Sequence, residues 1–574
     1  MKMKLHPKTT AMLLLLFGLT ACDFSGINDA VDDFNLVIGL EPIHTSGSVL
    51  VTDAKTGELI NDKITVTMTG PNGEDVIDMY SDPLPFEEIN GGILNFGIRN
   101  ALAPSPDDPA RIRLVFSGDG YMTRSQTVEI PEEGPHQFAI SLIKENDPPS
   151  GYRSASNTDG RTGADGSIEQ DFHAEITNEQ QTDVSFFVPA GTIFRDGQGN
   201  NLSGRITTKM TYYDPSERDV MASLPYELIT ADGDPVYTAG LLNLQIEDEH
   251  GNRAKQVSSR DNPSKSMALA DAHNLVEFQM RIPDGYINPE TGGPLQEGDE
   301  LLIYTLDPDN IQKSSGSGME NLRYRVSGRA TYHSEFRVTG YIPPVPTPTP
   351  APVPTPDGEV PPDPVPVDII GESNPCTDLS NKIGDAEIKL DRSAGFNGPV
   401  NVVISGTGVQ TQEFTIPGGK EAHRIDQTPG VQVNYEFDPG YGTISGTHDF
   451  CDGGLQVTLP APPSTLVDAT IEVALECPSP DEKVRITDIP ASTLNYRKSN
   501  AASGTRWATV ENLKWNFDEE EDALSGGSFV ASGVEQGVDY TFMISYDDNI
   551  HKADINIEGE QFTYQQSVDN DVCD

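Results

Sequence analysis

The chain has few cysteines, few basic residues and no long apolar run. Five cysteines and two tryptophans occur in 574 residues, and 89 acidic residues outnumber 38 basic ones, which gives a net charge of −51. Such a negative surface repels nucleic acid and anionic lipid headgroups, so we expect neither as a partner. The apolar run from Ala11 to Leu19 is shorter than the roughly 20 residues that span a bilayer core.

The motifs of common enzyme classes are also missing. There is no Gly-x-Ser-x-Gly elbow, no His-Glu-x-x-His pair, no phosphate-binding Gly-x-x-x-x-Gly-Lys loop and no dinucleotide-binding fingerprint. The ten histidines are scattered, without the close spacing of a shared metal site. We therefore predict a protein that is not an enzyme, with no catalytic residue, metal or cofactor. A hydrolytic site built from scattered carboxylates stays open as an alternative, because such acids need not be close in sequence.

The N-terminus resembles the signal peptide of a bacterial lipoprotein. Lys2, Lys4 and Lys8 precede the apolar run, which ends in the lipobox-like sequence Leu19-Thr-Ala-Cys22. The resemblance implies removal of residues 1–21, lipid with acyl chains such as palmitate on Cys22, and a mature chain anchored in the cell envelope. The outer membrane or cell surface is the favoured location. Asp23 resembles the signal that keeps enteric lipoproteins at the inner membrane, on its periplasmic face.

The other four cysteines all follow residue 370. An even number in an oxidising compartment predicts two disulfides, for which three pairings exist. We favour the pairing in which each bond encloses one apparent domain, and a zinc site is the less favoured alternative because no Cys-x-x-Cys pair occurs. The favoured pairs are Cys376–Cys451 and Cys477–Cys573.

After a tether of residues 22–43, residues 44–148 have the pattern of a small β-sandwich. Alternating apolar residues surround a turn in Ser46–Ile60 and continue in Ile64–Met68, which predicts a hairpin. A Gly118-Asp-Gly-Tyr121 turn lies between later strands. These features resemble the carboxypeptidase regulatory-like (transthyretin-like) domain, although Asn61-Asp-Lys63 replaces the small residues usual in that family. The resemblance implies an accessory sandwich without catalytic residues.

Residues 149–341 are predicted to form a second β-rich sandwich region. One segment of this region resembles an extracellular region that follows regulatory-like domains in some surface proteins, and it also resembles the first residues of ZU5-type modules. The segment is Val184-Ser-Phe-Phe-Val-Pro-Ala-Gly-Thr-Ile-Phe194. Alternating apolar residues with Gly, Asn and Asp turns favour a sandwich. No long apolar stripe of helical period occurs, so we expect an all-β fold of tandem Ig-like or transthyretin-like modules.

Residues 342–369 are rich in proline and form the clearest predicted boundary. Such a segment favours polyproline II and would act as a stiff linker, reaching about 75 Å at about 3.1 Å per residue. Two disulfide-containing β modules are predicted after it, at 370–463 and 464–574. They are interpreted as copies of one module, because Gly430–Asp438 and Gly537–Ser545 have similar patterns, each before a cysteine.

Two further patterns have both a functional and a structural interpretation. Four Asp- and Asn-rich loops could supply calcium ligands, but the same residues build ordinary turns, which is the favoured interpretation. Trp507 and Trp515, with Tyr496 and Phe517 nearby, could stack on sugars, but core packing is favoured. The four loops are Asn157–Gly166, Asp232–Asp234, Asp307–Asn310 and Asp547–Asn549.

These observations favour an envelope lipoprotein with a non-enzymatic binding or adhesion role. In this hypothesis two sandwich domains form a stalk, and the proline-rich linker presents the C-terminal modules to a glycan or protein ligand. The alternatives are a carbohydrate-active or hydrolytic lipoprotein and a structural component of an envelope assembly.

Overall fold

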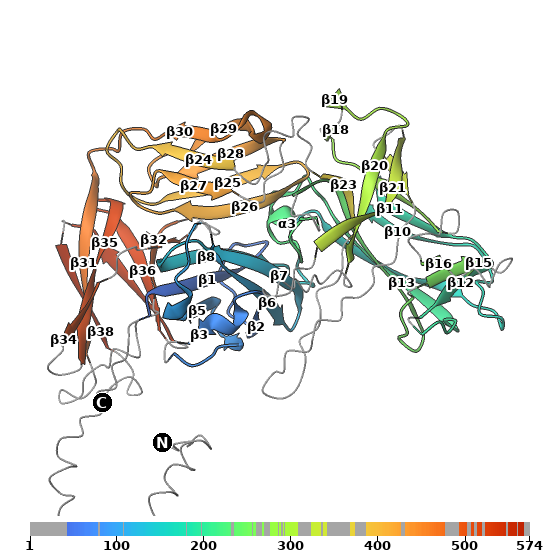
Figure 1. Cartoon of the computed structure of the whole chain (residues 1–574), viewed down its shortest axis with the longest axis horizontal. Coiled ribbons are helices and arrows are strands. Elements are labelled where there is room, and N and C mark those ends of the chain that lie inside the picture. The colour runs from blue at the N-terminus through green and yellow to red at the C-terminus, as the bar shows by residue number, and fades with distance from the viewer. Residues whose placement is uncertain are drawn as a thin grey trace, which may run out of the picture. The chain divides into compact units, whose positions relative to one another are not determined.

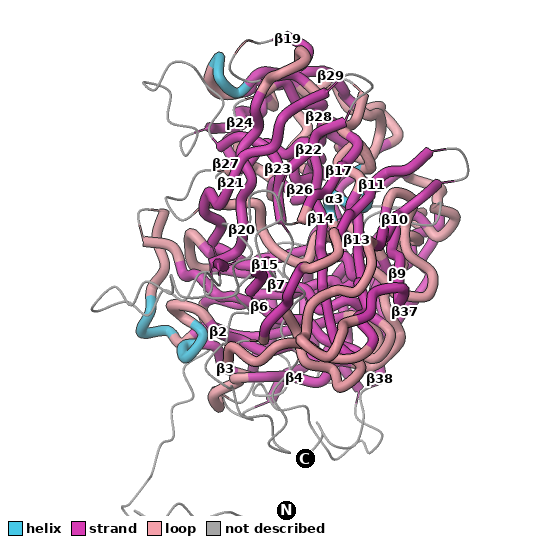
Figure 2. The backbone as a smooth tube through the Cα atoms, turned by 90° about the vertical axis from the view of Figure 1, so that its right-hand side faces the viewer, coloured by secondary structure: helices cyan, strands magenta, loops and turns pink. Residues whose placement is uncertain are grey.

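The structure is a computed structural model that describes residues 43–567 with gaps, the longest of which are 308–322, 341–367, 374–385 and 477–492. Strands dominate the described chain, and helix is confined to short turns (Figure 2). The all-β prediction is therefore confirmed. Within this part of the chain, no helix is long and apolar enough to cross a membrane. Cys22, Asp23 and the rest of residues 1–42 lie outside the described residues.

The first module is a sandwich of two four-stranded sheets, ordered β3-β5-β1-β8 and β4-β2-β6-β7. Strand β6 shows why it forms, because Ile112, Leu114 and Phe116 lie at every second position and are completely buried between the sheets, whereas the residues between them are only partly buried. Its strands are β1 (Thr45–Asp53), β2 (Ile64–Thr69), β3 (Val76–Ile77), β4 (Phe86–Ile89), β5 (Ile93–Ile98), β6 (Ala110–Gly118), β7 (Tyr121–Ile130) and β8 (Gly134–Leu142), with 3₁₀ turns at Gly73–Asp75 and Asn100–Leu102.

The predicted hairpin at the start of this module is only partly correct. The turn after β1 is present, since the Asp53 N–H donates to the Glu58 carbonyl at 2.8 Å and Thr52 bridges Leu59. Strand β2, however, pairs with β4 and β6 in the opposite sheet. Alternation identified both strands, but it could not show that the chain crosses the core between them.

The second module contains a ten-stranded sheet with the order β10-β11-β17-β22-β21-β20-β23-β14-β13-β9. Its two outer strands lie against each other, and the Asn157 side chain on β9 donates to the His173 carbonyl on β10 at 3.0 Å. Its strands are β9 (Tyr152–Arg161), β10 (Phe172–Asn178), β11 (Gln181–Val188), β12 (Thr192–Arg195), β13 (Arg205–Tyr213), β14 (Val236–Asp248), β15 (Gln256–Ser259), β16 (Met267–Ala268), β17 (Glu277–Arg281), β18 (Ile287–Asn288), β19 (Gly293–Pro294), β20 (Glu300–Asp307), β21 (Arg323–His333), β22 (Arg337–Gly340) and β23 (Asp368–Ser373), and its helix is α3 (Arg218–Ala222).

Strand β23 changes the predicted domain boundary. It follows the proline-rich segment, yet it pairs with β14 and β20 in the middle of the second module's sheet. The boundary placed at residue 370 therefore runs through a strand. Because β22 and β23 are three strand positions apart, about 14 Å at about 4.8 Å each, the proline-rich segment begins and ends on one sheet. Its two ends do not separate two modules, contrary to the stalk-and-linker hypothesis.

The third module is a sandwich of a three-stranded sheet, β27-β24-β30, and a four-stranded sheet, β26-β25-β28-β29. Val402, Ile404 and Phe437 are completely buried between the sheets. Its strands are β24 (Ala386–Asp391), β25 (Val400–Gly406), β26 (Val409–Ile416), β27 (Ala422–Ile425), β28 (Gln432–Asp438), β29 (Ile444–Asp449) and β30 (Leu455–Thr458), with a 3₁₀ turn at Phe450–Asp452.

The fourth module has two four-stranded sheets, β34-β35-β31-β38 and β33-β32-β36-β37. Figure 1 shows its strands at the red end of the colour scale. They are β31 (Leu466–Glu476), β32 (Thr493–Lys498), β33 (Ala508–Thr509), β34 (Lys514–Asp518), β35 (Ala523–Glu535), β36 (Asp539–Tyr546), β37 (Asn549–Asn556) and β38 (Gln561–Ser567).

The first, third and fourth modules share one topology. In each, the first strand (β1, β24 or β31) lies between an antiparallel neighbour and the parallel last strand (β8, β30 or β38). The two segments predicted to be equivalent, around 430–438 and 537–545, form β28 and β36, which occupy matching positions. The cysteines do not match in this way, because Cys451 precedes the last strand of its module whereas Cys573 follows the last strand of the next.

Candidate functional site

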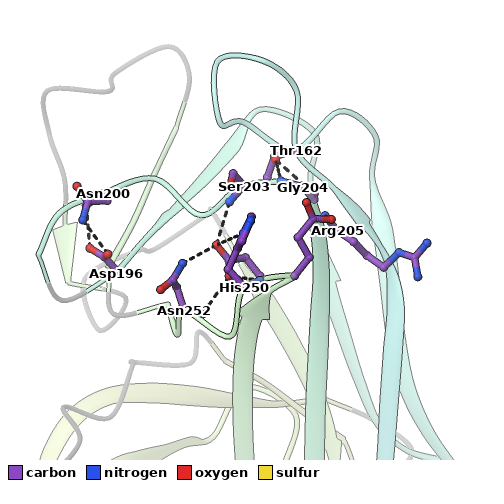
Figure 3. Close-up of polar contacts among 10 residues, drawn as sticks. Thr162, Asp196, Asn200, Ser203, Gly204, Arg205, His250 and Asn252 are labelled. Carbon is purple, nitrogen blue, oxygen red and sulfur yellow. Dashed lines mark hydrogen bonds and ion pairs between the residues drawn. The ribbon is translucent and has the colours of Figure 1, made fainter.

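The strongest cluster of polar contacts lies at two turns of the second module. The sequences Asp196-Gly-Gln-Gly-Asn200 and Asp248-Glu-His-Gly-Asn252 follow β12 and β14. In both turns the Asp carboxylate accepts hydrogen bonds from the backbone N–H and the side-chain amide of the Asn, at 2.8–3.0 Å. Figure 3 shows Asn200 directed at Asp196 in one turn and Asn252 in the other.

The two carboxylates differ in burial. Asp248 is buried, and it also accepts from the backbone N–H of His250 at 2.9 Å and of Ser203 at 3.4 Å. Burial by itself raises the pKa of Asp248, but the hydrogen bonds from Asn252, His250 and Ser203 outweigh it and hold that pKa below its usual value. The hydrogen bond from the Asn200 side chain lowers the pKa of the more exposed Asp196.

These hydrogen bonds stabilise the two turns, and they occupy the carboxylate oxygens that could otherwise act as metal ligands. Each carboxylate is used by N–H groups of its own loop, as Asx-turn geometry requires. Gly199 and Gly251 have φ of +86° and +82°, a backbone conformation that favours glycine. The repeated Asp-x-x-Gly-Asn pattern is present in the sequence, but neither turn belongs to the four candidate calcium loops.

The four candidate calcium loops can be followed only in part within the described residues. Residues 157–161 of the candidate loop Asn157–Gly166 form the end of strand β9 rather than a loop. The Asp159 carboxylate accepts from the Asn157 side chain at 3.1 Å, and Asp165 accepts from the Ser167 hydroxyl at 2.7 Å. No group of three His, Cys, Asp or Glu side chains that could hold a metal ion occurs within the described residues. The loop Asp232–Asp234, and the aspartate side chains of the other two loops, lie outside those residues.

A buried arginine joins the first and second modules. The Arg124 guanidinium donates to the carbonyl of Ser141 in its own module at 2.6 Å and to that of Ala222 in the second module at 2.7 Å. Burial lowers the pKa of Arg124 to about 10, while Glu227 raises it, so the group stays charged at neutral pH. Beside it, the Ser125 N–H donates to the Pro225 carbonyl at 2.9 Å, which covers the edge of β7.

A glycine turn joins the second and third modules. The Gly408 carbonyl accepts from the Thr238 N–H at 2.8 Å, and the Gly408 N–H donates to the Pro215 carbonyl at 2.9 Å. Two residues on, the Gln410 side chain accepts from the Leu228 N–H at 2.9 Å. One apolar core cluster continues from the second module into the third.

Trp507 packs between the fourth and first modules. The residue is 8% exposed and belongs to one apolar cluster with Leu50 and Ile93 of the first module, and its ring centroid lies 4.4 Å from Cζ of Arg497. The prediction that Trp507 is buried rather than an exposed sugar platform is therefore correct, but the ring packs in a cluster shared with the first module and not in the core of its own sandwich. The side chain of Trp515 lies outside the described residues.

Of the four cysteines in the predicted disulfides, Cys451 alone lies within the described residues. Cys451 lies in the 3₁₀ turn before β30, and its N–H donates to the Asp449 carboxylate at 2.9 Å. Cys376, Cys477 and Cys573 lie outside the described residues, so the pairing stays a prediction.

No family model matches the chain, and no curated protein matches it. The resemblance of residues 44–148 to the carboxypeptidase regulatory-like domain therefore stays an expectation.

Proposed function

We propose that the protein is a lipid-anchored component of the bacterial cell envelope that binds a protein or glycan ligand without catalysis. The lipobox-like sequence ending at Cys22 supports the anchor. The fixed packing of the modules carries the binding role, since Arg124, Gly408 and Trp507 each hold two modules together. Surfaces that extend over fixed modules are pre-organised, which lowers the entropy cost of binding a large ligand.

The surface chemistry supports a polar or positively charged ligand. Among the described residues, Ile287 and Val530 are the only large apolar side chains that are exposed, at 43% and 44%. The net charge of −51 disfavours nucleic acid and other polyanions. The C-terminal modules remain the proposed ligand-binding part, now held against the other modules rather than presented on a stalk.

Palmitate labelling of cells tests the anchor. The wild-type chain should incorporate label and fractionate with membranes, whereas Cys22→Ala should do neither, because one thiol carries the lipid. Asp23→Ser is the matched control, since it retains Cys22 and should change at most the membrane in which the protein is found. Label on Cys22→Ala, or its retention in the membrane, would refute lipidation at Cys22.

Protease treatment of intact cells then tests exposure and the binding role. Accessible modules should be cut in unbroken cells, and the purified mature chain should bind host or neighbour glycans or proteins. Complete protection until the outer membrane is opened would refute a surface ligand. It would favour the alternative of a structural component in an envelope assembly, which the fixed module junctions also fit.

A further inference from the structure

Three Asn–Gly pairs occur in the chain, at Asn72-Gly73, Asn90-Gly91 and Asn397-Gly398. Asparagine before glycine is open to attack by its own backbone, because glycine has no Cβ to hinder its nitrogen as it approaches the side-chain amide carbon. The reaction also needs an exposed asparagine, and a glycine N–H that solvent can reach and that donates to no other group. The structure distinguishes the three pairs on these requirements.

The first pair is held by three hydrogen bonds. The Asn72 side chain accepts from the Arg111 N–H at 2.9 Å and donates to the Asp75 carboxylate at 3.3 Å. The Gly73 N–H donates to the Gly70 carbonyl at 3.2 Å. Neither the amide carbon nor the attacking nitrogen is therefore free to move.

The third pair is blocked at its glycine. Asn397 is exposed, but Gly398 is buried. The Gly398 carbonyl accepts from the Arg392 guanidinium at 2.7 Å, and a Cβ on Gly398 would lie 3.1 Å from the Ser532 carbonyl oxygen. Solvent has little access to this backbone segment, and the buried arginine fixes its position.

The second pair meets all of the requirements. It lies in the three-residue turn 90–92 that connects β4 to β5. Asn90 is exposed and Gly91 is half-buried. Within the described part of the chain, neither the Asn90 side chain nor the Gly91 N–H makes a hydrogen bond.

We propose that Asn90 is a site of spontaneous deamidation, and that its isoaspartate product loosens the contact between the first and fourth modules. The Gly91 nitrogen loses its proton and forms a bond to Cγ of Asn90, and the side-chain nitrogen leaves as ammonia. Water then opens the cyclic imide at one of its two carbonyls, which gives aspartate or isoaspartate. Both products add a negative charge, and isoaspartate also adds one carbon atom to the backbone of the turn.

The turn can take up this extra carbon only at its centre. Ile89, on one side, is buried in the first module's core. On the other side the Gly92 carbonyl accepts from the Val51 N–H at 2.7 Å, and a Cβ on Gly92 would lie 2.6 Å from the Val51 carbonyl oxygen. At Gly91, between them, a Cβ would lie 2.6 Å from Cδ1 of Ile550 in the fourth module. Ile550 packs against the apolar cluster shared by the two modules, so a shift of Gly91 disturbs that cluster.

Ageing of the purified mature chain in warm, mildly alkaline buffer, followed by peptide mass spectrometry, tests the modification. Asn90 should be converted first, and Asn72 should react at least about tenfold more slowly, because three hydrogen bonds must open there. In denaturant the three pairs should react at similar rates, since the folded structure alone distinguishes them. Native rates at Asn72 or Asn397 that equal the rate at Asn90, or a preference for Asn90 that persists in denaturant, would overturn the assignment.

Hydrogen exchange of the aged chain tests the effect on the module contact. Exchange should increase in β37, which contains Ile550, and stay unchanged in β28 of the third module. Asn90→Ala cannot form the imide and is the matched control, so ageing should not change its exchange in β37. Fresh Asn90→Asp carries the new charge on an unaltered backbone and should show a smaller increase. Equal β37 exchange in the aged wild type and aged Asn90→Ala, or a full increase in fresh Asn90→Asp, would overturn the role of isoaspartate.

Discussion

A cut in the proline-rich segment should leave the protein in one piece under native conditions. We consider a protease site inserted after Ala351, inside the segment whose two ends join β22 and β23. Strand β23 forms six register pairs with β14 and three with β20. At about 0.5–1 kcal/mol per pair, these nine pairs contribute about 5–9 kcal/mol, before the contacts made by Gly408 and Gln410 are counted.

The assay is size-exclusion chromatography of the cut chain, with and without denaturant. The two fragments should co-elute at micromolar concentration and separate only when unfolded. Ile370→Pro in the centre of β23 should release the C-terminal fragment after cutting, because proline removes a ladder donor in a strand paired on both sides. Ala351→Pro is the matched control and should have no effect. Separation of the wild-type fragments in native buffer would refute the reasoning.

Two further predictions concern the module junctions. Gly408→Val should destabilise the junction between the second and third modules, because an added Cβ would lie 2.3 Å from the Thr238 carbonyl oxygen, at a φ of +79°. Hydrogen exchange of β14 should therefore increase. The increase should exceed that for Gly419→Val, where φ is +76° but no atom lies within 4 Å of the added Cβ. Arg124→Met should lower the free energy of unfolding by about 2–4 kcal/mol in thermal or urea melts, since it leaves buried carbonyls without donors. Arg111→Met, at a more exposed ion pair with Glu129, should cost under about 1 kcal/mol, and equal effects of the two would contradict the role of Arg124.

The local pattern predicted much of the secondary structure. Alternation identified β6 and β14, and the Gly118–Tyr121 turn lies between β6 and β7 as expected. These predictions succeed because burial of one sheet face requires apolar residues at every second position, whatever the strand is paired with. The same reasoning predicted that Trp507 packs in the interior, since large aromatic residues in small sandwiches are mostly buried.

The candidate site was less predictable. Asp and Asn in loops can be recognised from the sequence, but the sequence does not reveal which carboxylates already accept hydrogen bonds from their own turn. Asp248 illustrates this, because its oxygens are occupied by Ser203 and Asn252, and Ser203 comes from another part of the chain.

The sequence by itself determined the strands, the turns and the all-β class, because these depend on side-chain periodicity and on residues a few positions apart. Only the tertiary structure decided that β2 crosses to the opposite sheet, that β23 returns to the second module, and that three modules share one topology. Strand pairing is made by backbone groups that are the same in every residue except proline, so a strand's sequence does not specify its neighbour. The neighbour is fixed when distant segments bury a common core, which is why the proline-rich segment suggested a boundary that the sheet does not have.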